Sequence, residues 1–412
     1  MNNFIVIIFQ SALRLGAGVL VFLSNMYMAR YLPQETVGWY FACLSLVAFV
    51  SSVAVFGNDK RTLRVLSKVK VYYFHTYYLA VVGKIIMSIM IVVFISLSLY
   101  YGFQVPYLST SLVLLISFSV ISLYLSSLLL ASENNTQLQI ATFLQNLIFL
   151  ILLFIFNENI KVGSDVILLY AISVGIFVIY SLLVFSGFSY ENSNNHNKFA
   201  ASDFFKGYEL FISSLAQSLS AVAPIWIISY FFGDNEIAIY GIIIKSAFVI
   251  NILISMVDAN YSRKFASNLG GKLELQVIVR EASRMMFFLA VPIILLMMYI
   301  SPYYLLMFGE SYSQESLILV IYLIGMLVNV CTGNAGYLLL MKGYDKEFRK
   351  INIMGLLVYL AFLLALIPFF SALGAVMAFV IYSCVINISS YKCCYQKLGI
   401  STFPLSINLQ KL

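Results

Sequence analysis

Charged residues are scarce in this chain. Asp, Glu, Lys and Arg make up only 10% of its 412 residues, whereas a soluble domain carries roughly 25%. Hydrophobic residues reach 62%. Most side chains therefore have no water to face, which excludes an ordinary soluble protein and predicts a chain that lies in a bilayer.

Residues that hold metals or carry redox chemistry are also few. The sequence has two histidines, His75 and His196, and five cysteines without a C-x-x-C pair. We expect no metal and no bound cofactor. A Gly-rich phosphate loop and a nucleophile triad are missing too, and the longest loop assigned to the outside, 301–316, carries only Glu310 and Glu315. The sequence thus predicts a protein that is not an enzyme.

Long apolar runs dominate what remains. A membrane-spanning helix needs about 20 apolar residues, and the runs do not alternate as barrel strands do. The first run, Phe4 to Met28, is too long for the core of a signal peptide, so we expect it to stay as a spanning helix. The fold class is therefore all-α, a polytopic membrane protein with about twelve helices. They are expected at 4–29, 36–56, 77–101, 107–131, 137–156, 165–187, 209–232, 237–260, 284–306, 316–341, 350–370 and 373–396.

The cations indicate an orientation. With the N-terminus in the cytoplasm, the inside loops and the tail hold 19 Lys and Arg residues, while the outside loops hold only Arg30 and Lys161. This bias predicts that both termini are cytoplasmic. The net charge of +7 then reflects membrane topology, and we expect no nucleic-acid partner.

The chain has two similar halves. Residues 31–40 resemble residues 231–240, and the Leu128–Leu130 run matches Leu338–Leu340, each pair being about 200 residues apart. The order of these matches predicts a parallel repeat of six helices. We expect an N-terminal bundle over 1–188, a polar cytoplasmic linker over 189–206, and a C-terminal bundle over 207–412 that ends in a short cytoplasmic tail.

Three cations lie inside the predicted spans. Arg14 is near the middle of the first helix, on a polar stripe with Gln10 and Asn25; Lys245 lies deep in the eighth helix, and Lys84 is nearer the cytoplasmic end of the third. Lipid offers such groups no hydrogen bonds, so each must face a cavity or a partner. We interpret Arg14, Lys245 and Lys84 as cations of a substrate cavity, with Gln10 and Asn25 on its wall. The alternative is a structural ion pair, or for Lys84 a side chain that reaches the membrane surface.

The seventh helix is the most polar span. Glu209, Ser213, Gln217 and Ser220 lie on one face, and Pro224 permits a bend. They are expected to form a polar cavity wall with a hinge at Pro224, although close helix packing also favours small residues. Glu209 and Asp258 are candidates for coupling a proton or a sodium ion. Alternatively, Glu209 stabilises a helix N-terminus and Asp258 pairs with Arg263 and Lys264 at the membrane surface.

Three segments carry a family resemblance. They are Ala29–Leu32 with Gly38–Tyr40, Ile239–Gly241, and Gly336–Gly343. The sequence thereby resembles the polysaccharide flippases (Wzx-type) of the multidrug/oligosaccharidyl-lipid/polysaccharide (MOP) exporter superfamily. The resemblance implies two six-helix bundles in a V shape like that of MATE transporters, around a cavity that opens to either side in turn. The first and seventh helices would flank that cavity.

The resemblance also implies a function. The substrate would be an oligosaccharide linked to undecaprenyl pyrophosphate, an O-antigen or capsule repeat unit, moved from the cytoplasmic to the outer leaflet of a bacterial inner membrane. The protein would act as a monomer among membrane lipids, with a polysaccharide polymerase and a chain-length regulator as partners. Two alternatives stay open: a multidrug or cation antiporter of the same superfamily, and a membrane glycan polymerase or glycosyltransferase.

Overall fold

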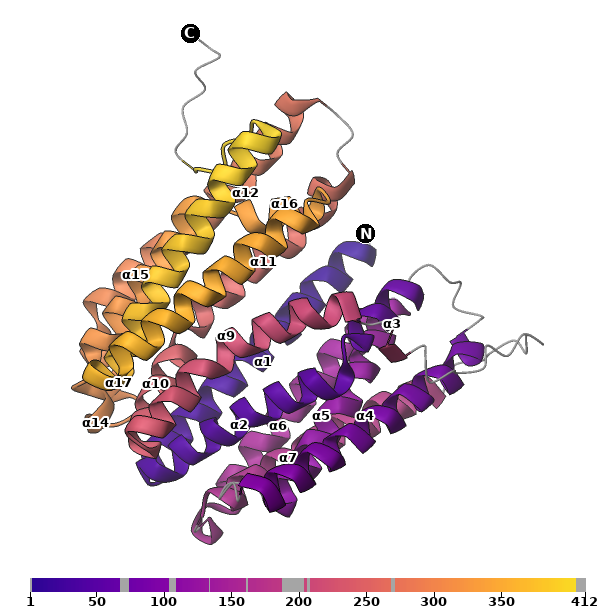
Figure 1. The fold of residues 1–412 in the computed structure, drawn as a ribbon, viewed down its shortest axis with the longest axis vertical. Coiled ribbons are helices and arrows are strands. Elements are labelled where there is room, and N and C mark those ends of the chain that lie inside the picture. The colour runs from indigo at the N-terminus through magenta and orange to yellow at the C-terminus, as the bar shows by residue number, and fades with distance from the viewer. Residues whose placement is uncertain are drawn as a thin grey trace. The chain divides into compact units, whose positions relative to one another are not determined.

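The protein is all-helical in the computed structural model (Figure 1), which describes residues 2–66, 74–103, 109–132, 134–160, 162–186, 204–205, 208–267 and 271–404. The chain divides into two compact units, Met1–Val222 and Ala223–Leu412. The dividing point lies inside a helix, α9 (Tyr208–Phe231). The linker expected over 189–206 lies outside the described residues except for Phe204 and Phe205.

The first unit contains seven helices and the beginning of α9 within the described part of the chain. The seven are α1 (Asn2–Tyr31), α2 (Gln34–Val55), α3 (Asn58–Leu66), α4 (Phe74–Phe103), α5 (Thr110–Ala131), α6 (Asn135–Ile155) and α7 (Gly163–Ser186). A short 3-10 turn, Asn157–Asn159, precedes α7. Helix α5 packs on α2, α3, α4 and α7, while α1 packs mainly on α6.

Aromatic rings fill the inside of this unit. Tyr40 of α2, Phe149 of α6 and Tyr170 of α7 pack together, and Phe149 and Tyr170 have ring centroids 4.9 Å apart. Tyr124 of α5 is fully buried, and its hydroxyl lies 3.1 Å from the Ser88 Oγ of α4. Each buried hydroxyl needs such a partner because lipid provides none.

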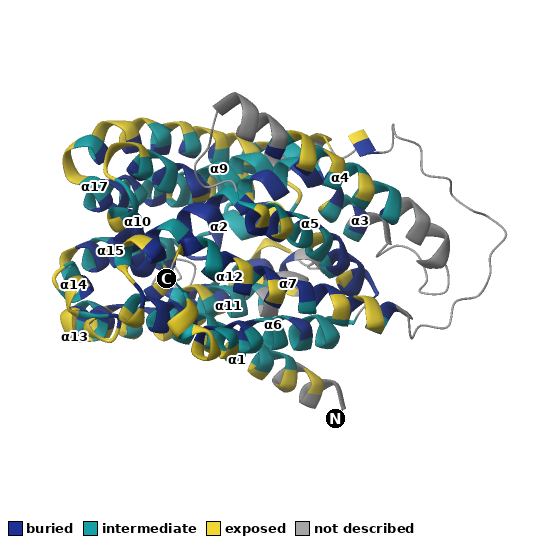
Figure 2. Cartoon of the chain, turned by 90° about the horizontal axis from the view of Figure 1, so that it is seen from below, coloured by how far each residue is buried: buried dark blue, intermediate teal, exposed yellow. Residues whose placement is uncertain are grey.

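The second unit is built from the end of α9 and the helices that follow. These are α10 (Asp234–Ser246), α11 (Phe248–Ser267), α12 (Lys272–Tyr299), α13 (Ser301–Leu306), α14 (Glu310–Ser313), α15 (Ser316–Thr332), α16 (Ala335–Met341) and α17 (Asp345–Leu398). Two pairs act as broken spans: α10 and α11 meet at a bend of 43°, and α15 and α16 at a bend of 50°. Figure 2 shows buried positions on the inner faces of the helices and exposed positions on the outer faces.

Helix α17 consists of two antiparallel arms. A straight helix of its 54 residues would be ~80 Å long at ~1.5 Å per residue, far more than a ~30 Å hydrocarbon core. The helical conformation is interrupted at Ser371, where φ is 49° and ψ is −128°. The arms then pack side by side: Gly355 lies directly against Ile386, and the rings of Tyr359 and Tyr382 stack at 4.7 Å.

The twelve expected segments are helical where the structure describes them, apart from their ends and the breaks at residues 247, 300 and 333–334. Eight helices are long and apolar enough to cross a membrane, and the two bent pairs bring the number to ten. The apolar stretch Val81–Ser96 of α4 and the second arm of α17 account for the other two. The chain is thus a multi-pass membrane protein.

Two helical regions differ from the expectation. The polar helix α3 was expected as a loop, and α12 begins at Lys272 rather than at residue 284. Both segments carry charges, so a search for apolar runs passes over them. Both helices pack on their neighbours: α3 packs on α5, with Asn58 and Thr62 buried, and α12 packs on α11 and α15.

Candidate functional site

Arg14 is an exposed cation inside a span. It lies in α1, about 18 Å from the first residue of the helix at ~1.5 Å per residue, and its side chain is exposed. Within the described part of the chain it has no carboxylate partner. Gln10 and Asn25 do not share its exposure. The Gln10 amide donates to Thr136 Oγ1 of α6 at 2.8 Å, and the buried Asn25 amide donates to the Val21 carbonyl at 2.8 Å.

Lys245 lies in the last turn of α10, where α10 and α11 bend. The side chain is exposed, and no described carboxylate pairs with it. Its neighbour Ser246 is fully buried, and the Ser246 carbonyl accepts a hydrogen bond from the Tyr304 hydroxyl at 2.7 Å. The bend is therefore held by a side chain from α13.

Lys84 is held within the first unit. Its Nζ lies 3.5 Å from Thr62 Oγ1, and the side chain is half-buried. Thr62 belongs to α3, the helix that the sequence did not predict. Lys84 thus has a protein partner, unlike the two exposed cations.

Helix α9 contains the polar face predicted as a cavity wall. Gln217 is exposed, and the Ser220 hydroxyl donates to the Gln217 carbonyl at 2.8 Å. The side chains of Glu209 and Ser213 lie outside the described residues. Pro224 is buried within the helix, two residues after the point that divides the two units.

The beginning of α9 is anchored to the first unit by contacts that the sequence did not reveal. The rings of Phe56 and Phe211 stack with centroids 4.3 Å apart, and Lys60 Nζ donates to Ser214 Oγ at 2.9 Å. Phe56 has a left-handed φ of 51° at the end of α2, which turns the chain toward these partners. The sequence offered one sign of this turn, because Gly57 directly follows an apolar run.

Asp258 of α11 is bound to a helix break. It accepts a hydrogen bond from the amide of Asn334, which lies between α15 and α16. Of its two alternative partners, Lys264 lies over the ring of Tyr261 at 4.8 Å from its centroid, and the side chain of Arg263 lies outside the described residues. Asn334 is 6% exposed, so the carboxylate takes part in fixing a buried corner of the second unit.

Acidic groups gather at the opposite end of the second unit. Glu236, in the first turn of α10, accepts a hydrogen bond of 2.5 Å from the Ser371 hydroxyl at the turn of α17. Burial, together with the nearby Glu236 carboxylate, raises the pKa of Glu315, which precedes α15. These carboxylates lie outside the apolar part of the helices, as their hydration requires.

Comparison with known proteins decides what fold this is. No protein-family model matches the sequence, and no curated protein matches it either. Solved structures do match. The lipid II flippase MurJ, in an inward closed conformation, superposes with a TM-score of 0.76 over 94% of this chain and 87% of that one, at 13% identity. A multidrug-resistance MATE transporter of the MOP superfamily, in an inward-facing conformation, gives 0.64 over 95% and 94%, at 12% identity.

A third structure extends the comparison. A MOP superfamily transporter from Pyrococcus furiosus, described as having a binding pocket of reverse polarity, gives a TM-score of 0.58 at 15% identity, over 96% of this chain and 93% of that one. The chain has the fold of MOP-superfamily transporters. None of these three neighbours is described as an enzyme.

Within this MOP fold, several residues of the segments that carried the family resemblance are packing residues. Tyr40 and Tyr240 are 4% and 3% exposed. Gly163 at the start of α7 lies directly against the Trp39 ring, and Gly336 faces Phe348 and Ser390. These buried positions shape the fold, whereas Arg14 and Lys245 are exposed.

Proposed function

We propose that this protein is a flippase for an oligosaccharide linked to undecaprenyl pyrophosphate, an O-antigen or capsule repeat unit. It moves this lipid from the cytoplasmic to the outer leaflet of a bacterial inner membrane by alternating access, with both chain termini in the cytoplasm. Its partner in this proposal is a polysaccharide polymerase that consumes the repeat unit on the outer side.

One observation carries the proposal: each unit exposes a cation from inside a span. Arg14 and Lys245 have no described carboxylate partner, although a charge at the centre of a bilayer costs about 3 kcal/mol on an insertion scale. A charge that costs this much is kept inside a span where it binds an anion. A pyrophosphate group supplies the matching negative charge, and the similarity to a lipid II flippase supports a fold that accommodates a lipid-linked substrate.

A cation antiporter is the second candidate, since MATE transporters share the fold. The observation in its favour is Asp258, a carboxylate inside a broken span. Its hydrogen bond to Asn334 gives it a structural role, whereas Arg14 and Lys245 are exposed and have no described carboxylate partner. Their sign favours an anionic substrate over a cationic drug.

The test is transport in vesicles. The purified protein is reconstituted with a fluorescent undecaprenyl-pyrophosphate-linked oligosaccharide, and the fraction reaching the opposite leaflet is followed with a membrane-impermeant quencher. We expect Arg14→Gln and Lys245→Gln each to lower the initial rate at least roughly tenfold, the loss of one charged hydrogen bond. Lys392→Gln, which removes an exposed cation near the end of α17, serves as control and should retain the rate.

Two results would contradict the proposal. Wild-type vesicles that leave the labelled lipid on its original side, while the same protein lowers the accumulation of a cationic dye in cells, would identify an antiporter. Wild-type rates in both cation variants would remove Arg14 and Lys245 from the substrate site.

A further inference from the structure

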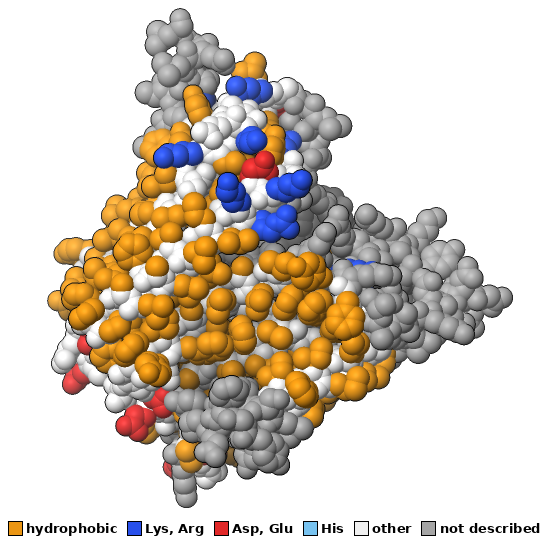
Figure 3. Space-filling view, viewed as in Figure 1, with side chains coloured by type: hydrophobic (Ala, Val, Ile, Leu, Met, Phe, Trp, Pro, Cys, Tyr) orange, Lys and Arg blue, Asp and Glu red, His pale blue; other side chains and the backbone are white. Residues whose placement is uncertain are grey.

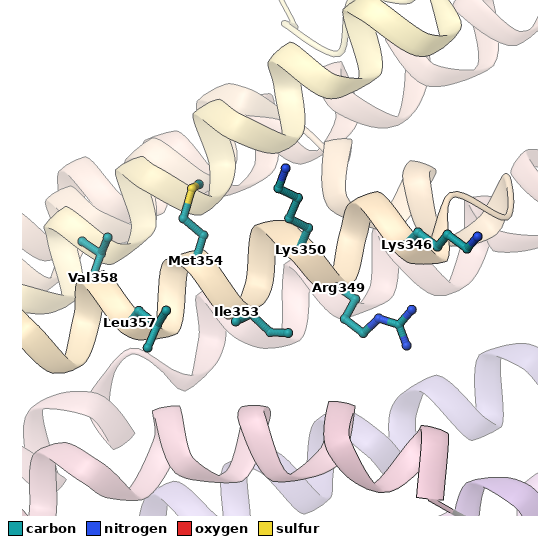
Figure 4. A pocket seen from close by; sticks show the side chains of 7 residues that line it. All are labelled: Lys346, Arg349, Lys350, Ile353, Met354, Leu357 and Val358. Carbon is teal, nitrogen blue, oxygen red and sulfur yellow. The ribbon is translucent and has the colours of Figure 1, made fainter.

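A groove runs along the first arm of α17, on a face of the second unit (Figure 4). Its volume is about 450 Å³. Cations line one end and apolar side chains line the rest. The lining residues are Lys346, Arg349, Lys350, Ile353, Met354, Leu357 and Val358.

The spacing of these residues places them on one helical face. Neighbouring members of the set are three or four residues apart along the helix. In Figure 4 they form two rows: Lys350, Met354 and Val358 point to one side of the helix, and the other lining residues point away from that side. The opposite face of this arm is buried against the second arm through Gly355 and Tyr359. Packing on that side therefore fixes the groove in its exposed position.

The three cations of the groove lie within little more than one turn. Lys346, Arg349 and Lys350 are all exposed, and no carboxylate among the described residues pairs with any of them. Glu347, beside them in sequence, is bound to Lys397 at 3.5 Å. Like charges three and four residues apart on a helix repel one another, so an anion that binds all three relieves this repulsion.

The apolar part of the groove has the length and exposure of a lipid-chain site. From Lys346 to Val358 the helix rises ~18 Å at ~1.5 Å per residue. Leu357 is 62% exposed, and the exposed face continues to Leu364 at 59%. A head group at the cations would thus send its chain along the helix toward the middle of the membrane.

Charge decides which amphiphile fits. A single phosphodiester head carries one negative charge and needs one cation, whereas this groove offers three at one end. A pyrophosphate that joins a lipid to a sugar carries two negative charges on adjacent phosphates, and Arg and Lys are the side chains that bind such oxygens best. The groove therefore matches a long-chain lipid whose head group is a pyrophosphate.

We propose that this groove binds the pyrophosphate and the first isoprenoid units of the lipid-linked substrate at the membrane face where α17 begins. Lys346, Arg349 and Lys350 hold the pyrophosphate, and Ile353, Met354 and Leu357 contact the chain. This inference rests on the proposed function, and it adds a loading site that is distinct from Arg14 and Lys245.

The test measures binding, so it does not depend on transport. The full chain is purified in detergent, and its affinity for undecaprenyl pyrophosphate is compared with that for phosphatidylglycerol by native mass spectrometry. We expect the wild type to prefer the pyrophosphate lipid. The triple variant Lys346→Gln, Arg349→Gln and Lys350→Gln should bind it at least roughly tenfold more weakly, since three charged contacts are lost.

Two further variants sharpen the result. Lys264→Gln, Lys272→Gln and Lys392→Gln together remove three exposed cations of the same unit that do not line the groove, and this control should bind as the wild type does. Leu357→Trp keeps every cation but fills the apolar part of the groove, and it should also weaken binding. Both variants change exposed side chains, so folding is checked by the melting temperature of each.

The outcomes separate this inference from the proposed function. Unchanged affinity in the triple variant, or equal weakening in the control, would overturn the groove as the loading site even if wild-type vesicles transport the lipid. Equal affinity for both lipids would overturn the assignment to a pyrophosphate. Loss of binding in the triple variant supports the groove, and a failure of wild-type transport would then count against the flippase alone.

Discussion

Gly333 sits at a corner where only glycine fits. It has a positive φ of 70° between α15 and α16, and a Cβ there would clash with the Thr402 carbonyl oxygen and with Ser283 Oγ. The Thr402 hydroxyl in turn donates to the Thr332 carbonyl at 2.6 Å. The C-terminal segment thus packs on the break that presents Asn334 to Asp258.

Gly333→Ala is expected to destabilise the second unit. The backbone of Gly333, with φ 70° and ψ −169°, lies in a region that essentially only glycine occupies, which costs a residue with a Cβ about 1–3 kcal/mol, and the clash with a backbone oxygen adds about 1–3 kcal/mol. Gly343→Ala is the matched control, because Gly343 has a similar φ of 79° but nothing lies within 4 Å of its Cβ position. Melting temperatures in detergent should therefore fall more for Gly333→Ala. Equal losses would show that the clash is relieved without cost.

At the scale of single elements, the turn of α17 combines strain with a polar contact. Ser371 has a φ of 49° without being glycine, and its hydroxyl donates to Glu236 at 2.5 Å. That contact fastens the turn between the two arms to the first turn of α10. The arm that carries the groove is therefore held at both ends, by this turn and by the Lys397–Glu347 pair.

Two substitutions at Ser371 separate these effects. Ser371→Ala loses a hydrogen bond to a charged group, at a cost of about 1.5–3 kcal/mol. Ser371→Gly loses the same bond but relieves backbone strain of about 1–3 kcal/mol. We expect both variants to melt below the wild type or near it, with Ser371→Gly the more stable of the two. A less stable glycine variant would mean that the φ of 49° is not strained in its surroundings.

Helix α9 is the element that joins the units. Its beginning is bound to α2 and α3 through Phe211 and Ser214, while its end belongs to the second unit. Pro224 removes one backbone hydrogen bond just beyond the dividing point. The hinge at Pro224 remains a prediction, and its position at this boundary is what a hinge requires.

At the scale of the whole molecule, charge is distributed unevenly along the helices. Figure 3 shows Lys and Arg side chains gathered at one end of the visible surface of the second unit, a broad hydrophobic band, and acidic side chains at the other end. Lys272 begins α12, and Glu310 follows that helix and α13 at the far end. The band is what a bilayer covers, and the basic end is expected in the cytoplasm.

This orientation can be tested with single cysteines. In a variant lacking the five native cysteines, Glu310→Cys is expected to react with a membrane-impermeant maleimide in intact spheroplasts, because Glu310 is exposed at the acidic end. Lys272→Cys is exposed at the basic end and should react only after the membrane is permeabilised. The reverse labelling pattern would invert the topology and contradict loading of the lipid from the cytoplasmic leaflet.

The apolar helices could be predicted closely from the sequence, because membrane insertion is a local matter: about 20 apolar residues are favourable in lipid wherever they occur. The helix α3 and the first turns of α12 escaped this reasoning, since they are stabilised by packing on neighbouring helices. Arg14 and Lys245 were found because a charge in an apolar run is conspicuous. The groove on α17 was not found from the sequence, because Lys and Arg residues next to a span are common in every cytoplasmic loop.

The sequence by itself determined that this protein lies in a membrane, that its helices are separated at the observed turns, and that cations are unusually deep in two of them. Composition and spacing suffice for these conclusions because the bilayer acts on each segment alone. Only the tertiary structure decided which polar groups satisfy one another. Gln10 and Lys84 bind neighbouring helices, and Asp258 binds a helix break, whereas Arg14 and Lys245 stay exposed. These hydrogen bonds join residues that are far apart in the chain, so no local sequence pattern predicts them.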